Sequence, residues 1–168
     1  MKPKYIKYFM DVAKLTAKLS HAKRLKVGTV IVKDNRIISC GYNGLPAGWE
    51  PNVCETVTFL SDSEYFDTTI EEQKRFVPID GTLFWKGMKT YDEVVHSEAN
   101  AISRLASSAE SGVGAAIFCT HSPCINCSKM IYGAGIVSIY YDQEYRCDKG
   151  VKFLEKCGVE VIKYKSLD

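Results

Sequence analysis

Three residues able to ligate a metal ion occur in two short stretches of the chain. His96-Ser97-Glu98 contains an imidazole, and Pro123-Cys124-Ile125-Asn126-Cys127 contains two thiols. One histidine and two cysteines can hold zinc by three protein bonds, and a catalytic zinc keeps its fourth position for water. Glu98 lies two residues from the histidine, where a carboxylate can carry protons between that water and a substrate. The pattern therefore predicts a zinc centre at His96, Cys124 and Cys127, with Glu98 as the catalytic acid–base group.

Each stretch falls where a helix is expected to begin. Residues 98–108 carry apolar side chains at helical spacing, and residues 124–132 precede glycines that can end a helix. Cys124 and Cys127 are three positions apart, so they project from one face of a turn. A helix N-terminus favours the ionised thiol, which is the form that ligates zinc. The backbone N–H groups of Ser97 and Cys124 are expected to help hold the carbonyl of a bound ring.

Simpler interpretations of these residues must be weighed. A lone Cys-x-x-Cys can be a redox pair or half of a structural zinc knot, and a single histidine is more often a surface or core residue than a ligand. The chain has no second Cys-x-x-Cys, and the redox interpretation does not explain Glu98 or Pro123. A non-catalytic zinc-binding interaction module has no use for the carboxylate of Glu98 either.

The elements around these stretches alternate between helices and strands. Helices are expected at 4–20, 98–108, 124–132 and 149–156, and strands at 25–32, 36–41, 115–120, 136–141 and 159–164. Residues 33–35 read as a hairpin turn, and residues 43–95 as a loop-rich insertion with at most short helices. We expect one α/β domain over residues 1–168. It should be a three-layer α-β-α sandwich on a five-stranded mixed, largely parallel sheet, whose last two strands are parallel because a helix separates them.

Bulk composition limits the partners and the location. The 168 residues carry a net charge of +2 with no block of basic residues, so binding to nucleic acid has little support. No apolar run approaches the roughly 20 residues of a membrane span, and residues 1–20 lack a signal-peptide core. Seven cysteines is an odd number, which argues against a disulfide framework. We therefore expect a reducing, cytoplasmic location, or the host cytoplasm for a viral protein.

Four stretches carry a resemblance to a known family. The order H-x-E…P-C-x-x-C is typical of zinc deaminases, and the chain resembles the cytidine/deoxycytidylate deaminase superfamily over nearly its whole length. The stretch 41–46 reads GYNGLP and 96–102 reads HSEANAI, and these narrow the resemblance to deoxycytidylate (dCMP) deaminases. The other two stretches are RLKVGTVIVKD at 24–34 and SPCINCSK at 122–129. The resemblance implies the cytidine-deaminase-like fold, zinc at His96, Cys124 and Cys127, and Glu98 as the proton shuttle.

The resemblance also implies nucleotide contacts. Asn43 matches an asparagine that hydrogen-bonds the sugar or base edge, although it could simply occupy a turn. Arg24 lies where bacterial-type relatives place a phosphate-binding arginine, although it could be an exposed cation at the end of a helix. Tyr145 matches a tyrosine near the substrate phosphate. Arg146 stands where the family usually has histidine, and it could add a phosphate contact of its own.

Regulation and assembly are implied by resemblance alone. The related enzymes are typically homo-hexamers that dCTP with Mg²⁺ activates and dTTP inhibits, and the effector site would include Gly41, Tyr42 and Gly44. Some relatives carry a second, structural zinc. His21 and Cys54 lie in about those places, and Glu55 or Glu93 could complete the set. A surface histidine and a buried cysteine explain His21 and Cys54 equally well.

These observations predict hydrolysis of dCMP to dUMP and ammonia, which supplies a precursor for thymidylate synthesis. The main alternative is deamination of a polynucleotide, either tRNA adenosine or single-stranded DNA cytidine, which needs a basic track for several phosphates. A bifunctional enzyme that also accepts dCTP is a second alternative.

Overall fold

A five-stranded mixed sheet forms the centre of the computed structural model, which describes residues 1–165 (the side chain of residue 71 apart). The strand order is β2-β1-β6-β7-β8, with bounds Arg36–Tyr42, Gly28–Lys33, Ala116–His121, Ser138–Gln143 and Glu160–Lys163. β6, β7 and β8 are parallel, so the parallel pairing predicted for the last two strands is confirmed.

The other half of the sheet is antiparallel. The antiparallel pairing of β1 with β2 confirms the predicted hairpin, whereas the antiparallel pairing of β1 with β6 departs from the largely parallel sheet that was expected. β2 and β6 are therefore parallel to each other, and the helical crossover between them passes over β1. The hairpin turn between β1 and β2 is confirmed, since Asp34 and Asn35 both have positive φ, as a two-residue type I′ turn requires.

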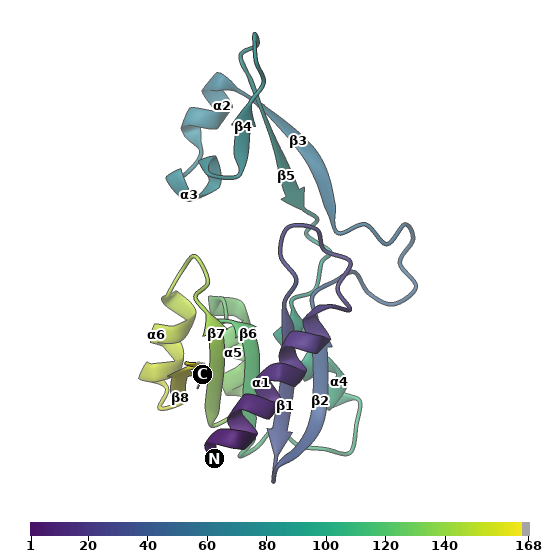
Figure 1. Ribbon diagram of the computed structural model, residues 1–168, viewed down its shortest axis with the longest axis vertical. Coiled ribbons are helices and arrows are strands. Elements are labelled where there is room, and N and C mark those ends of the chain that lie inside the picture. Colours follow the sequence, from purple (N-terminus) through teal and green to yellow (C-terminus); the bar gives the residue numbers. More distant parts are fainter. Residues whose placement is uncertain (166–168) are drawn as a thin grey trace.

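Helices cover both faces of this sheet (Figure 1), which confirms the three-layer α-β-α sandwich. Successive side chains of a strand point to opposite faces, so each strand supplies two cores. α1 (Pro3–Ala17) packs on one face, where Phe9 contacts Phe118. α4 (Ser97–Ala106), α5 (Ile125–Gly133) and α6 (Lys149–Lys156) cover the other face, around Ile31, Ile117 and Ile139. No helix among residues 1–165 has both the length and the apolar character needed to cross a membrane.

Gly41 allows α4 to lie unusually close to β2. A Cβ atom at this position would lie 2.4 Å from the carbonyl oxygen of Ser97 and 2.5 Å from the backbone nitrogen of Ala101. The side-chain amide of Asn100 also donates to the carbonyl of Tyr42 at 2.7 Å. These contacts seat the first turn of α4 on the sheet, and that turn carries Glu98.

The insertion is more regular than predicted. Its centre is a three-stranded antiparallel sheet of order β3-β5-β4, and it extends away from the main sheet as an arm (Figure 1). The strands are β3 (Glu55–Ser61), β4 (Phe76–Pro78) and β5 (Phe84–Thr90), and the helices are α2 (Asp62–Asp67) and α3 (Ile70–Gln73). The short helices were expected, but the loop-rich description of 43–95 was wrong for the strands. In β3 the apolar Val57 and Phe59 lie on the more exposed face, so the strand does not bury its apolar side chains in a core.

Candidate active site

His96, Cys124 and Cys127 converge as predicted. Their ligand atoms all lie within 4.8 Å of one another, and the Nδ1 atom of His96 is 3.6 Å from Cys124 Sγ and 3.4 Å from Cys127 Sγ. Tetrahedral zinc, with bonds of about 2.1 Å to nitrogen and 2.3 Å to sulfur, would separate nitrogen from sulfur by about 3.6 Å. The donor set and its spacing therefore fit a zinc ion, which would be held by Nδ1 of His96.

The two helix starts present these ligands. His96 is the N-cap residue of α4, and Cys124 is the N-cap residue of α5. The Sγ atom of Cys124 accepts the backbone N–H of Cys127 at 3.5 Å, so this thiol takes the place of the usual capping oxygen. Cys127 is buried and Cys124 is half-buried, while the histidine faces solvent.

The surroundings of Cys124 stabilise its thiolate. Hydrogen bonds from the Cys127 thiol, from the ring of His96 and from the backbone N–H of Cys127 lower the pKa of Cys124 to about 3. The same contact raises the pKa of Cys127, because the Cys127 thiol donates its proton to a hydrogen bond with the Cys124 thiolate and because burial disfavours a second charge. The pair is thus one thiolate and one thiol before a metal binds, and metal binding would displace the remaining proton.

Glu98 lies beneath this cluster at the end of a buried hydrogen-bond chain. Its side chain is 5% exposed, and burial raises its pKa although a hydrogen bond from Ser97 opposes the shift. Ser97 Oγ donates to Glu98 Oε2 at 2.8 Å and lies 2.8 Å from Thr29 Oγ1, which lies 3.0 Å from Cys119 Sγ. Burial raises the pKa of Cys119 to about 12, so this residue remains a thiol able to donate.

Because Ser97 gives its proton to Glu98, it accepts from Thr29, and Thr29 accepts from Cys119. Only the backbone of Ser97 was expected to act in the site, and this chain of side chains was not predicted. Thr29 and Cys119 are polar or polarisable residues in otherwise apolar strands. That mismatch is the signal from which the chain could have been found.

A cavity of about 800 Å³ opens above the cluster. It joins His96, Ser97, Glu98 and Cys124 to four residues predicted to contact a nucleotide, namely Arg24, Asn43, Tyr145 and Arg146. The structure thus brings the chemical and the nucleotide-binding candidates together in one space. Effector candidates Gly41, Tyr42 and Gly44 do not line it.

The nucleotide-binding candidates are held in different ways. The amide of Asn43 accepts the backbone N–H of Val27 and donates to the carbonyl of Leu25, both at 2.8 Å, so it braces a cavity wall. Arg24 donates to Thr90 Oγ1 at 2.7 Å. Arg146 lies over the ring of Tyr145, with 5.2 Å between its guanidinium carbon and the ring centroid.

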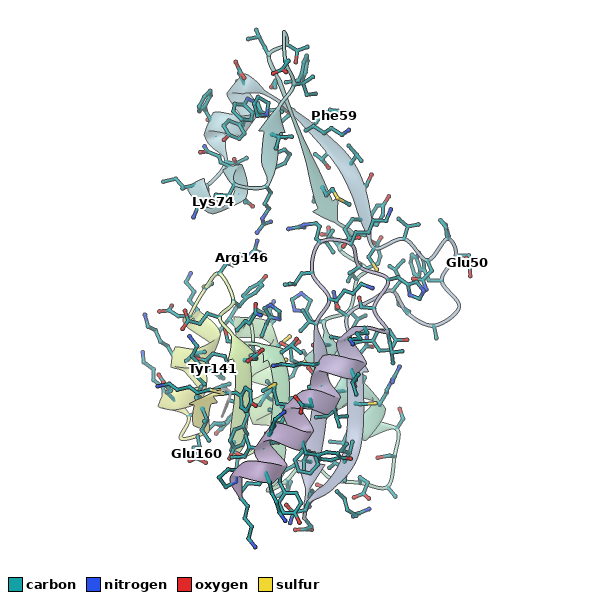
Figure 2. The ribbon with its side chains drawn as sticks, viewed as in Figure 1. Glu50, Phe59, Lys74, Tyr141, Arg146 and Glu160 are labelled. Carbon is teal, nitrogen blue, oxygen red and sulfur yellow. The ribbon has the colours of Figure 1, made fainter. Side chains whose placement is uncertain are left out.

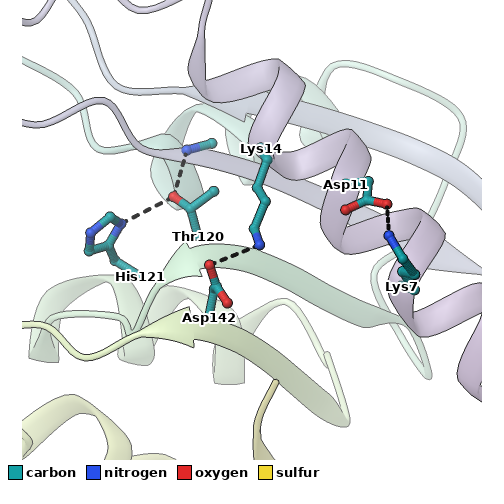
Figure 3. Close-up of polar contacts among 7 residues, drawn as sticks. Lys7, Asp11, Lys14, Thr120, His121 and Asp142 are labelled. Atoms are coloured by element: carbon teal, nitrogen blue, oxygen red, sulfur yellow. Dashed lines mark hydrogen bonds and ion pairs between the residues drawn. The ribbon is translucent and has the colours of Figure 1, made fainter. Parts of the chain in front are cut away.

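Three further basic residues of the cavity were not anticipated. Arg75 and Lys89 reach the cavity from the insertion, and His121 is the last residue of β6. His121 contacts Thr120 Oγ1 at 3.2 Å (Figure 3), and burial lowers its pKa. The position of His121 directly at a strand end was a usable signal. Nothing local to the sequence marks Arg75, because its place at the cavity depends on how the arm packs.

The remaining candidates lie outside this cavity. The guanidinium carbon of Arg104 lies over the Tyr42 ring, 5.7 Å from the ring centroid, and Gly44 forms a backbone bridge with Val95. His21 is exposed, with Nδ1 3.4 Å from the amide nitrogen of Asn52. Cys54 is buried, and burial raises its pKa.

The predicted second zinc site gains no support. Of residues 1–165, only His96, Cys124 and Cys127 form a group of three converging metal ligands. Glu55, which we considered as a ligand beside His21 and Cys54, accepts the backbone N–H groups of Lys23 and Arg24 instead. Glu93 is exposed.

Comparison with known proteins gives the site its context. Residues 3–143 match the model of the cytidine and deoxycytidylate deaminase zinc-binding region. The chain is 32% identical to the deoxycytidylate deaminase of Mycobacterium phage D29, over 85% of this chain and 98% of that one. It is 30% identical to the deoxycytidylate deaminase of Enterobacteria phage T4, over 91% of this chain and 86% of that one.

A solved structure agrees over almost the entire length. The dCMP deaminase from cyanophage S-TIM5, in complex with dCMP and dUMP, is 37% identical. It superposes with a TM-score of 0.75 over 98% of this chain and 99% of that one. The extent of these matches and the converged histidine and cysteines lead to one conclusion: the chain belongs to the cytidine and deoxycytidylate deaminase family of zinc-binding proteins.

Proposed function

We propose that the protein hydrolyses dCMP to dUMP and ammonia. The observation that carries this proposal is the single cavity that joins Glu98 and the histidine–cysteine cluster to Arg24, Tyr145 and Arg146. Glu98 with the histidine–cysteine cluster suits hydrolysis of a ring C–N bond, and the guanidinium groups of Arg24 and Arg146 suit a phosphate. The names of the phage relatives, and the dCMP and dUMP bound in the cyanophage structure, support the same substrate.

The residues of the chain would divide the reaction between them. When bound, zinc supplies a Lewis acid that makes a water molecule acidic enough to act as a nucleophile near neutral pH. A carboxylate oxygen of Glu98 takes a proton as the water oxygen bonds to C4 of cytosine, and passes it to the ring nitrogen. Glu98 then takes the remaining proton from the new C4 hydroxyl and delivers it to the exocyclic nitrogen, the C4–N bond breaks, and ammonia leaves as the C4 carbonyl forms. The water and dCMP are thereby consumed, and dUMP and ammonia are the products.

Other groups would hold the substrate during these transfers. The backbone N–H groups of Ser97 and Cys124 stand at the N-terminal ends of α4 and α5, where helices have unpaired donors. We assign them to the ring carbonyl or to charge that develops on the ring. Arg24, Arg146 and Tyr145 line the part of the cavity assigned to the sugar phosphate, and Asn43 shapes the wall beside the base or sugar.

The proposal extends to regulation and assembly. Resemblance to the family supports a homo-hexamer activated by dCTP with Mg²⁺ and inhibited by dTTP, with effectors near Gly41, Tyr42 and Gly44. It also supports a cytoplasmic enzyme that supplies dUMP for thymidylate synthesis.

A substrate panel tests the activity. Ammonia release or absorbance change would be measured with dCMP, dCTP, deoxycytidine and CMP, each with and without added dCTP or dTTP. We expect dCMP to be the preferred substrate, and Glu98→Ala to be folded and zinc-loaded but inactive. Preference for dCTP would refute dCMP as the main substrate and favour a dCTP-accepting deaminase. Undiminished turnover by Glu98→Ala would refute the role of that carboxylate. A salt titration of oligonucleotide binding tests the polynucleotide alternative, because such binding weakens steeply with salt.

A further inference from the structure

Arg75 brings a positive charge from the insertion to the catalytic cavity. It lies between α3 and β4, and it lines the cavity with Arg24 and Tyr145, which belong to the main domain. In Figure 2 the arm stands over the side of the domain where Arg146 is labelled. The cavity therefore has one wall from the main domain and another from the insertion.

Packing within the arm sets the position of Arg75. Phe76 pairs with Gly87 across β4 and β5, and a Cβ atom at Gly87 would lie 2.6 Å from the Phe76 ring and 2.8 Å from the carbonyl oxygen of Arg75. Only glycine allows this close approach. Trp85 stacks on Tyr65 with 3.6 Å between ring centroids, which ties α2 to the same strand. The backbone that carries Arg75 is thus held by the core of the arm.

Arg75 and Arg24 act on each other electrostatically. Partial burial lowers the pKa of Arg24, and the positive charge of Arg75 lowers it further. Both cations also act on Tyr145, whose pKa is raised mainly by burial. Two guanidinium groups facing one space repel each other, and a dianion between them would relieve that repulsion.

Two acidic residues that line the cavity, Glu72 and Glu144, are engaged elsewhere. Glu72 accepts the backbone N–H and the hydroxyl of Thr69 in a capping box, and Glu144 pairs with Lys163 at 2.6 Å. Among the residues that the structure describes, Arg75 has no ion pair of its own, and the side chain of Arg24 donates to the neutral hydroxyl of Thr90. Both guanidinium groups can therefore turn to an anion in the cavity.

We propose that Arg75 binds the substrate phosphate from the side opposite Arg24, so that the insertion forms the second half of a phosphate clamp. This inference rests on the proposed function, because it assigns the phosphate of a bound nucleoside monophosphate. It gives the insertion a role in substrate selection: the arm favours phosphorylated substrates over the free nucleoside.

The test compares Arg75→Gln with a matched variant, Lys74→Gln, which removes the same charge one residue away and outside the cavity. The values of kcat/KM for dCMP and for deoxycytidine would be measured for each protein. A hydrogen bond to a charged group contributes about 1.5–3 kcal/mol, so Arg75→Gln should lower kcat/KM for dCMP by about 10- to 100-fold. The value for deoxycytidine should stay within about twofold, and Lys74→Gln should change neither.

Each result decides between the alternatives. Equal losses for dCMP and deoxycytidine, or no loss for dCMP, would overturn the clamp while leaving the proposed function intact. Failure of the wild-type protein to deaminate dCMP would instead refute the proposed function. If Arg75→Gln does not fold, Arg75→Lys provides the measurement, because it retains the charge but loses the forked geometry. Competition by inorganic phosphate adds a readout, and wild-type inhibition should exceed that of the Arg75 variant.

Discussion

Replacing Ser97 by alanine tests how the buried hydrogen-bond chain controls Glu98. The hydroxyl of Ser97 is fully buried and donates to Glu98 Oε2 at 2.8 Å. The change removes only that hydroxyl, and Thr29 keeps its contact with Cys119 at 3.0 Å. Because only one buried oxygen atom is lost, we expect Ser97→Ala to fold normally.

The size and sign of the effect follow from the hydrogen bond. A bond to a charged group contributes about 1.5–3 kcal/mol, and one pKa unit corresponds to about 1.4 kcal/mol. The bond favours the carboxylate and so lowers the pKa of Glu98 against the upward effect of burial. Its loss should therefore raise that pKa further. Because the reaction needs Glu98 as a carboxylate to accept a proton, activity should disappear at a higher pH than in the wild type.

The assay is a profile of kcat/KM for dCMP against pH, recorded with zinc-loaded enzyme. The acidic limb of Ser97→Ala should move to higher pH, so that kcat/KM at a pH on that limb falls by about 10- to 100-fold, with a smaller loss on the plateau. Ser128→Ala is the matched control, because Ser128 Oγ is buried and has no hydrogen-bond partner among the residues described. That variant should keep the wild-type profile. An acidic limb that stays in place in Ser97→Ala would refute the link between this hydroxyl and Glu98.

Three further changes have defined outcomes. Gly41→Ala should lower the free energy of unfolding by about 1–3 kcal/mol in thermal or denaturant melts, because the new methyl group would meet Ser97 at 2.4 Å; an unchanged stability would show that α4 can move freely. Cys127→Ala should copurify with little zinc and lack deaminase activity, and a full zinc content by metal analysis would contradict the ligand assignment. Glu55→Gln should destabilise the fold by about 1–3 kcal/mol and raise KM for dCMP, because the carboxylate of Glu55 accepts the backbone N–H groups of Lys23 and Arg24. A normal KM would show that these hydrogen bonds do not position Arg24 for substrate binding.

Chemical identity was readable from the sequence because it depends on short patterns. His96 and Glu98 share a helix start, and Cys124 and Cys127 share another, so local spacing already places each pair. The core strands and helices were predicted to within a few residues, since apolar periodicity reports burial directly. The parallel direction of the last two strands followed from the helix between them.

Tertiary structure alone decided how distant segments meet. The antiparallel pairing of β1 with β6 and the sheet of the insertion depend on contacts between strands far apart in the chain, which no local pattern records. The hydrogen-bond chain from Cys119 through Thr29 to Ser97 joins three elements, and Arg75 reaches the cavity only because the arm folds as it does. Residue types and spacing thus determined which chemistry is available, whereas long-range packing determined which side chains surround it, because each such contact depends on the positions of two separate segments at once.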